Sequence, residues 1–184
     1  MAKFDVRTRK IVKRVSFPKG SKPYMLRVSP AGGQLWVQAS GANTNSILDP
    51  STLEIKDTQP ESHSPITNAW TPDGRYALIT HDPDPSVTVR DGRTGKEVKR
   101  IEVGPGSATI GFTPDGKTAY VSVTGTNHVA VIDMTSLTVA LQIPVGNQPV
   151  GLIVMMPPVA QVRVTRKLLP SLPSLDAVAS DCLL

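Results

Sequence analysis

The sequence predicts an all-β fold built from repeated four-stranded antiparallel sheets, and three observations lead to this prediction. Glycine and proline are frequent, with 14 and 17 residues among 184, and both mark turns between short strands. No apolar run reaches the roughly 18 residues that a transmembrane helix needs. A Ser/Thr-Pro-x-Gly motif recurs every 42 residues, starting at Ser29, Thr71 and Thr113. Periods of about 20 to 50 residues are typical of stacked structural repeats.

Two further sets of residues keep the same register. One is the aspartate at Asp49, Asp91 and Asp133. The other is a proline at positions 23, 65 and 149, with Ser107 in the matching place. Large apolar residues also recur at 42-residue steps, and we expect them to form the core between neighbouring sheets; they are Val28, Trp70, Phe112 and Val154, and Trp36, Leu78 and Tyr120.

Each repeat is predicted to contain four short strands. In the clearest repeat these cover residues 108–112, 119–123, 129–132 and 138–145. The Pro-Asp-Gly turn ends the first strand, because proline suits the second position of a β-turn and glycine tolerates positive φ. Asp133 after the third strand can accept hydrogen bonds from backbone N–H groups two residues on. Four antiparallel strands in about 40 residues is the pattern of a β-propeller blade.

The repeats are expected to cover residues 3–154, with complete blades at about 23–59, 65–103 and 107–145. Residues 4–6 and 10–17 match the third and fourth strands of an earlier blade, and 149–154 the first strand of a later one. The sequence therefore predicts 15 strands in an incomplete or small ring. Residues 155–184 form a divergent tail without glycine or aromatic residues. Within it, 160–165 alternates like one strand, and a loop or short helix from Ser174 follows.

Three ways of completing the ring stay open at this point. The chain is part of a seven- or eight-bladed propeller, truncated or frame-shifted near residue 155. Alternatively, two half-rings associate into one closed ring. In the third case, the first two strands pair with residues 149–165 and close a four-bladed ring. Propellers typically have about four to eight blades.

The segments between 119 and 151 resemble the YVTN family of β-propeller repeats. The resemblance rests on Ala119-Tyr-Val-Ser-Val123, Val129-Ala-Val-Ile-Asp133, Leu141-Gln-Ile-Pro-Val-Gly146 and Pro149-Val-Gly151. The 71–112 repeat matches well, whereas 29–70 has Gln59-Pro-Glu-Ser62 in place of Ile-Pro-Val-Gly. The resemblance implies a WD40-like β-propeller, with seven-bladed lactonase-like proteins and haem d1-type propeller domains among the relatives. Full-length relatives are often periplasmic or secreted.

The histidines are the weak candidates for a binding site. His63, His81 and His128 fall in or next to loops that open on one face of a propeller, and Asp82 follows His81. Two histidines and a carboxylate suit a divalent metal, but the spacing is not compact, so we expect solvated loop residues and no metal site. No nucleophile elbow or phosphate-binding loop occurs, and Cys182 is the only cysteine. We therefore assign no catalytic residues and expect no cofactor.

Positive charge is concentrated at one end of the chain. Residues 1–28 contain nine Lys or Arg and one Asp, whereas 29–184 contain eleven Lys or Arg and fourteen Asp or Glu. We interpret the basic segment 7–14 as protection of an outer strand against edge-to-edge pairing, and we expect no nucleic acid partner. No secretory signal is recognisable, which gives a cytoplasmic location by default.

The sequence thus favours a non-enzymatic propeller that acts as a binding or interaction scaffold. Its expected partners are a second copy, the missing blades, or an unidentified protein or small molecule. The alternative is a fragment of an enzymatic or cofactor-binding propeller of the lactonase-like or haem d1 type.

Overall fold

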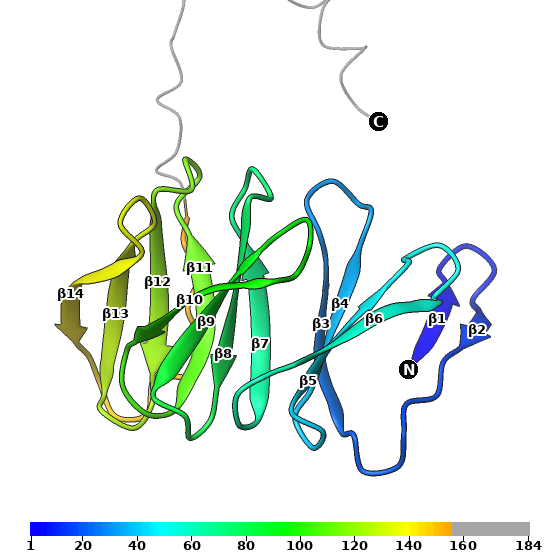
Figure 1. Ribbon diagram of the computed structural model, residues 1–184, viewed down its shortest axis with the longest axis horizontal. Coiled ribbons are helices and arrows are strands. Elements are labelled where there is room, and N and C mark those ends of the chain that lie inside the picture. The colour runs from blue at the N-terminus through cyan, green and yellow to red at the C-terminus, as the bar shows by residue number, and fades with distance from the viewer. Residues whose placement is uncertain (156–184) are drawn as a thin grey trace, which may run out of the picture.

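The computed structural model describes residues 1–155, and these residues form β-strands and turns without any helix (Figure 1). None of the described residues therefore lies in a helix that could cross a membrane. The strands are β1 (Ala2–Asp5), β2 (Lys10–Arg14), β3 (Pro23–Val28), β4 (Leu35–Ala39), β5 (Thr44–Leu48), β6 (Ile55–Pro60), β7 (Pro65–Trp70), β8 (Tyr76–His81), β9 (Ser86–Asp91), β10 (Glu97–Glu102), β11 (Ser107–Phe112), β12 (Thr118–Val123), β13 (His128–Asp133) and β14 (Thr138–Pro144).

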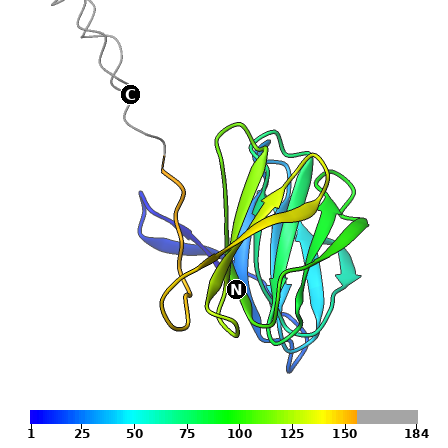
Figure 2. The ribbon, with the colours of Figure 1, turned by 90° about the vertical axis from the view of Figure 1, so that its left-hand side faces the viewer.

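These strands build three antiparallel sheets of four and one hairpin, β1–β2. We call β3–β6 the first blade, β7–β10 the second and β11–β14 the third. Each blade is a simple meander in chain order, and the innermost strands β3, β7 and β11 contact one another in sequence. The expected propeller blades are confirmed. The ring is not closed, because β14 and the β1–β2 hairpin lie at opposite ends of the arc (Figures 1 and 2).

The recurring turns form as their residues predict. The Thr71 hydroxyl donates to the Asp73 carboxylate at 2.6 Å and accepts from the Tyr76 N–H at 3.0 Å, while Gly74 has φ +71°. Thr113, Asp115 and Gly116 repeat this arrangement 42 residues later. The first two strands of the second and third blades are thereby joined by the same turn chemistry.

The core lies between the blades. Trp36 and Trp70 pack between the first and second blades with ring centroids 4.7 Å apart. A larger apolar cluster, which includes Leu78, Val121 and Ile132, joins the second blade to the third. The expectation for Val28 is wrong, because its side chain is 51% exposed. Val28 lies on β3 at one end of the arc, where the described residues place the two-stranded β1–β2 hairpin and not a complete blade.

Residues 149–154 correct the predicted strand count. They form no strand, so the described residues contain 14 strands rather than 15. Their position is nevertheless that of a first strand, because the Ser122 hydroxyl donates to the Val150 carbonyl oxygen at 2.8 Å. Thr80, 42 residues earlier, donates in the same way to the Ala108 carbonyl oxygen of β11 at 3.0 Å. The expected strand at 160–165, the helix from Ser174 and Cys182 lie outside the described residues.

Candidate functional site

A buried cluster of charged side chains joins the first blade to the second. Arg90 on β9 donates from Nε to the Glu61 carboxylate at 2.5 Å, and Glu61 lies in the connection after β6. The other Arg90 nitrogens donate to the Gln59 side chain and to the carbonyl oxygens of Pro60 and Gly95. One guanidinium thus holds the end of β6 against β9.

His81 is the third member of this cluster. Its Nδ1 lies 3.1 Å from the Ser86 carbonyl oxygen, which only accepts hydrogen bonds, so Nδ1 carries a proton. Its Nε2 lies 3.3 Å from the second Glu61 oxygen. A carboxylate only accepts, so this second contact is a hydrogen bond when Nε2 carries a proton. The side chains of Glu61 and His81 are fully buried.

The same places are apolar at the next interface. Residues 42 positions after Glu61, His81 and Arg90 are Val103, Val123 and Ile132, and all three are buried. The charged cluster therefore replaces part of a hydrophobic interface. Because no member of the cluster faces solvent, its geometry holds two blades together rather than presenting a catalytic group to a substrate.

A second set of polar contacts begins at Ser62, the residue after Glu61. The Ser62 hydroxyl donates to Asp84 and accepts from Arg100 at 3.0 Å, while Arg100 also binds Glu97. Burial acts to raise the pKa of Asp84, but hydrogen bonds from Ser62 and Ser86 outweigh it and lower that pKa. Asp84 is thus held as a carboxylate at neutral pH.

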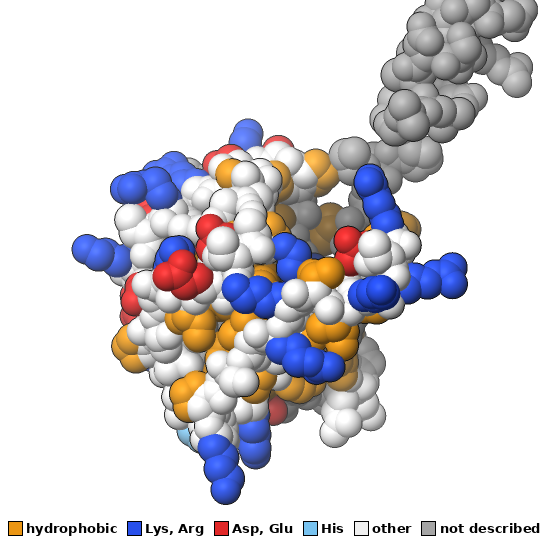
Figure 3. Space-filling model, turned by 90° about the vertical axis from the view of Figure 1, so that its right-hand side faces the viewer, with side chains coloured by type: hydrophobic (Ala, Val, Ile, Leu, Met, Phe, Trp, Pro, Cys, Tyr) orange, Lys and Arg blue, Asp and Glu red, His pale blue; other side chains and the backbone are white. Residues whose placement is uncertain are grey.

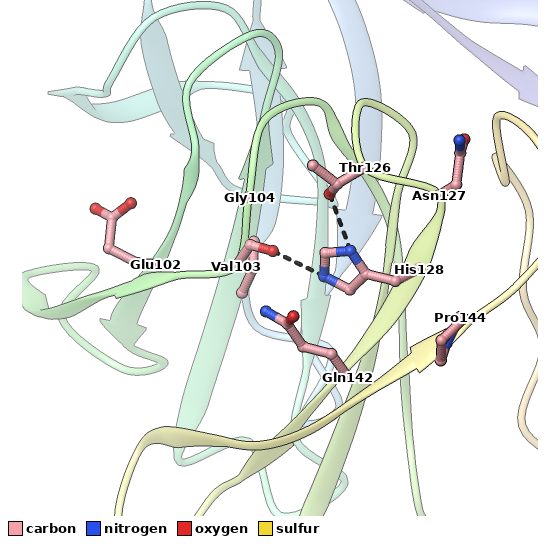
Figure 4. A pocket seen from close by; sticks show the side chains of 8 residues that line it. All are labelled: Glu102, Val103, Gly104, Thr126, Asn127, His128, Gln142 and Pro144. Atoms are coloured by element: carbon pink, nitrogen blue, oxygen red, sulfur yellow. Dashed lines mark hydrogen bonds between the residues drawn. The ribbon is translucent and has the colours of Figure 1, made fainter.

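The corresponding place at the next interface is an open pocket. This cavity of about 500 Å³ lies between the second and third blades, and Glu102, Thr126, His128 and Gln142 contribute to its lining (Figure 4). Thr126 and Gln142 stand 42 residues after Asp84 and Arg100, so the ion network that fills the earlier interface is missing here. The pocket is polar and open to solvent, which suits a small hydrogen-bonding ligand.

His128 is held firmly at the wall of this pocket. Its Nε2 donates to the Val103 carbonyl oxygen at 3.0 Å, and its Nδ1 then accepts from the Thr126 hydroxyl at 2.9 Å (Figure 4). Both ring nitrogens are therefore engaged by the protein. His128 is placed to shape the pocket rather than to bind a metal.

The structure does not bring the four residues that the sequence singled out into one site. His63 is exposed in the connection after β6, His81 is buried at the end of β8, and the adjacent Asp82 is exposed. His128 begins β13 of another blade. Among residues 1–155, no group of three or more His, Cys, Asp or Glu is arranged to hold a metal ion.

The sequence reasoning missed the Glu61–His81–Arg90 cluster. Glu61 belongs to the Gln59-Pro-Glu-Ser62 segment, where polar residues replace the apolar consensus. His81 and Arg90 likewise stand where the next repeat has valine and isoleucine. All three residues are polar at positions where the repeat is apolar, and they belong to the two sides of one blade interface. This pattern in the sequence would have revealed the cluster.

Comparison with known proteins supports the fold and leaves the activity open. A solved structure of hydrazine synthase from Kuenenia stuttgartiensis is similar, with a TM-score of 0.67 and 26% sequence identity over 76% of this chain. This chain spans 41% of the length of that chain. In total 855 solved chains match, so the architecture alone does not select a function. No protein-family model matches the sequence, and no curated protein matches it.

Proposed function

We propose that this chain is a segment of a YVTN-type repeat propeller that acts as a non-enzymatic interaction scaffold. The observation that carries the proposal is the contrast between the inside and the ends of the arc. Inside, buried polar groups such as Arg90 and Thr80 are engaged in holding blades together. At both ends, apolar side chains are exposed on strand faces.

The two ends differ in their residues but share this exposure. At the β3 end, Tyr24, Leu26 and Val28 are exposed. At the opposite end the exposed residues include Leu141, Val150 and Ile153. Contiguous apolar surface of this kind is typical of protein interaction sites. Either end is therefore a surface for a further blade, a second copy or another protein.

The aspartate turns support the YVTN-type assignment. Asp133 accepts hydrogen bonds from the backbone N–H groups of Thr135 and Ser136, and Asp49 and Asp91 make the equivalent contacts. The aspartates that recur in the family-like motif thus serve turn structure. Because these aspartates are engaged in turns, we assign partner recognition to the exposed surface of the arc.

Sedimentation equilibrium of the full chain over a range of concentrations tests the scaffold proposal. We expect species larger than the monomer, and we expect a double variant with Leu26→Glu and Leu141→Glu to stay monomeric. Both positions are exposed, so the variant should fold normally. A wild-type chain that stays monomeric throughout contradicts the proposal.

A second candidate is a segment of an enzymatic or cofactor-binding propeller, favoured by the likeness to hydrazine synthase. The polar pocket beside His128 would then be a remnant of, or an approach to, a site completed by other blades. Absorbance titration with haem and a lactone hydrolysis assay test this candidate. A haem absorption shift or turnover that is lost on His128→Ala would favour it over the scaffold.

A further inference from the structure

We infer that the free edge of β1 and the facing surface of β3 form a docking site for an extended strand whose apolar residues are flanked by acidic ones. This inference rests on the proposed scaffold function and names a surface and a partner chemistry for it. It is drawn from the backbone pairing, the groove and the charge at this end of the arc.

The backbone of β1 has one edge without a partner in the described part of the chain. Its equivalents β5 and β13 each pair with a strand on both sides, whereas β1 pairs with β2 alone. Met1 and Val15 exchange both backbone hydrogen bonds at 2.9 Å. Because such pairs alternate with non-bonded pairs in an antiparallel ladder, the N–H and carbonyl of Ala2 point away from β2. An extended segment can therefore join this edge by strand addition.

An apolar groove runs beside that edge. A cavity of about 200 Å³ lies between β1 and the first blade, and Ala2, Leu26, Val28 and Leu35 are among the residues that line it. Leu26 is 47% exposed. A strand paired with β1 would place alternate side chains over this surface, since successive side chains point to opposite faces. The partner strand therefore needs apolar residues at every second position.

The charge around the groove selects an acidic partner. Residues 1–28 contain nine Lys or Arg and one Asp. Figure 3 shows Lys and Arg side chains projecting around exposed hydrophobic atoms on this side of the molecule. Lys3 lies at the groove itself. Acidic residues on either side of the apolar strand would meet this basic rim.

The free ladder edge favours a protein strand over a membrane surface. A peptide backbone offers a donor and an acceptor at the spacing that pairs with the outward N–H and carbonyl of Ala2. A lipid surface would use the basic and apolar side chains but leave the backbone edge unpaired. Binding of a protein strand should therefore depend on the Ala2 N–H group, whereas binding of a lipid surface should not.

The test uses a synthetic peptide as the probe. It contains residues 107–123 of this chain, which are the first two strands of a blade, with three glutamates added at each end. A matched peptide carries three lysines at each end. Fluorescence anisotropy with the full chain measures binding, and hydrogen exchange shows which strands the peptide protects. Vesicles with phosphatidylserine provide the lipid comparison.

We expect the acidic peptide to bind at least about tenfold more tightly than the lysine peptide, and this preference to shrink with added salt. Ala2→Pro removes the outward N–H while leaving the β1–β2 bonds, and should weaken binding about tenfold. Leu26→Glu should also weaken binding about tenfold, because it places a charge in the apolar groove. Leu141→Glu at the far end is the control and should leave binding unchanged. Protection should fall on β1 and β3.

Equal binding of the two peptides overturns the inference, as does an equal loss in Leu26→Glu and Leu141→Glu. Vesicle binding that is insensitive to Ala2→Pro, without peptide binding, also overturns it. Protection confined to β14 and residues 150–155 would overturn this docking site while leaving the scaffold function standing. The scaffold function itself fails only on the sedimentation result described above.

Discussion

The Arg90 guanidinium on β9 binds the Glu61 carboxylate of the preceding blade, and both side chains are buried. Removing two charges from water is unfavourable, so such a pair is stable only when its remaining hydrogen bonds are satisfied. Here Gln59, Pro60 and Gly95 accept the other Arg90 donors. The pair therefore fits one specific partner blade, because stacking against an apolar face would leave a buried charge unpaired.

Arg90→Ile should strongly destabilise the chain. The substitution leaves the Glu61 carboxylate buried without its arginine partner, and breaking a buried pair in this way costs about 3–5 kcal/mol. Isoleucine is the residue that the next repeat carries at this position, Ile132. Urea denaturation followed by circular dichroism measures the loss. A free energy of unfolding within error of wild type would show that the pair is not a buried interaction.

The triple variant Glu61→Val, His81→Val and Arg90→Ile provides the matched comparison. It replaces the whole cluster by the residues of the next interface, and removing all charges together is often neutral or stabilising. We expect it to recover most of the stability that Arg90→Ile loses. If the triple variant is less stable than the single one, the cluster contributes net stability rather than specificity.

The hydroxyl of Thr80 should be needed between the second and third blades. It accepts from the Thr67 N–H at 3.2 Å and donates to the Ala108 carbonyl oxygen at 3.0 Å. Thr80→Val keeps the shape and leaves these buried groups unpaired, which costs about 1–3 kcal/mol. Thr138→Val, at an exposed position, is the control and should change the urea midpoint little. Equal effects of the two substitutions would contradict this role.

The sequence predicted the structure well at turn positions that follow the 42-residue repeat, and less well where burial depends on a neighbouring blade. Asp91 and Gly74 recur with the 42-residue period, and their turns form as expected. Val28 follows the period too but is exposed, because burial depends on the neighbouring blade and not on the residue alone. The sequence singled out His81 as a candidate binding residue but did not predict that its side chain is buried. Its partners Glu61 and Arg90 are distant in sequence, and only the packing of two blades brings them together.

Acid should destabilise the aspartate turns in a defined direction. Hydrogen bonds from the backbone N–H and hydroxyl of Thr94 lower the pKa of Asp91 below its ordinary value near 3.8. A pKa that is lowered by folding adds stability above the unfolded-state pKa, and this stability is lost as the pH falls through the folded-state value. Asp91→Asn should therefore lower stability at neutral pH and flatten the dependence below about pH 4.

Urea midpoints measured between neutral and acid pH check this dependence. Asp57→Asn is the control, because Asp57 lies exposed on β6 outside these turns. An unchanged pH profile in Asp91→Asn would show that the turn contacts do not persist in solution.

The central claim is that the blades form an open arc whose ends are available for interaction. Distance measurement between two spin labels tests it most directly, with labels on cysteines introduced at Phe4 of β1 and at Ile153, and Cys182→Ser as the background. Both labelled positions are exposed, and dilution with unlabelled chain keeps the signal within one molecule. In a closed four-bladed ring, residues 149–154 and β1 would be the first and third strands of one sheet, roughly 10 Å apart. The open arc predicts a separation more than about twice that spacing. A single short distance near two strand spacings would contradict the open arc.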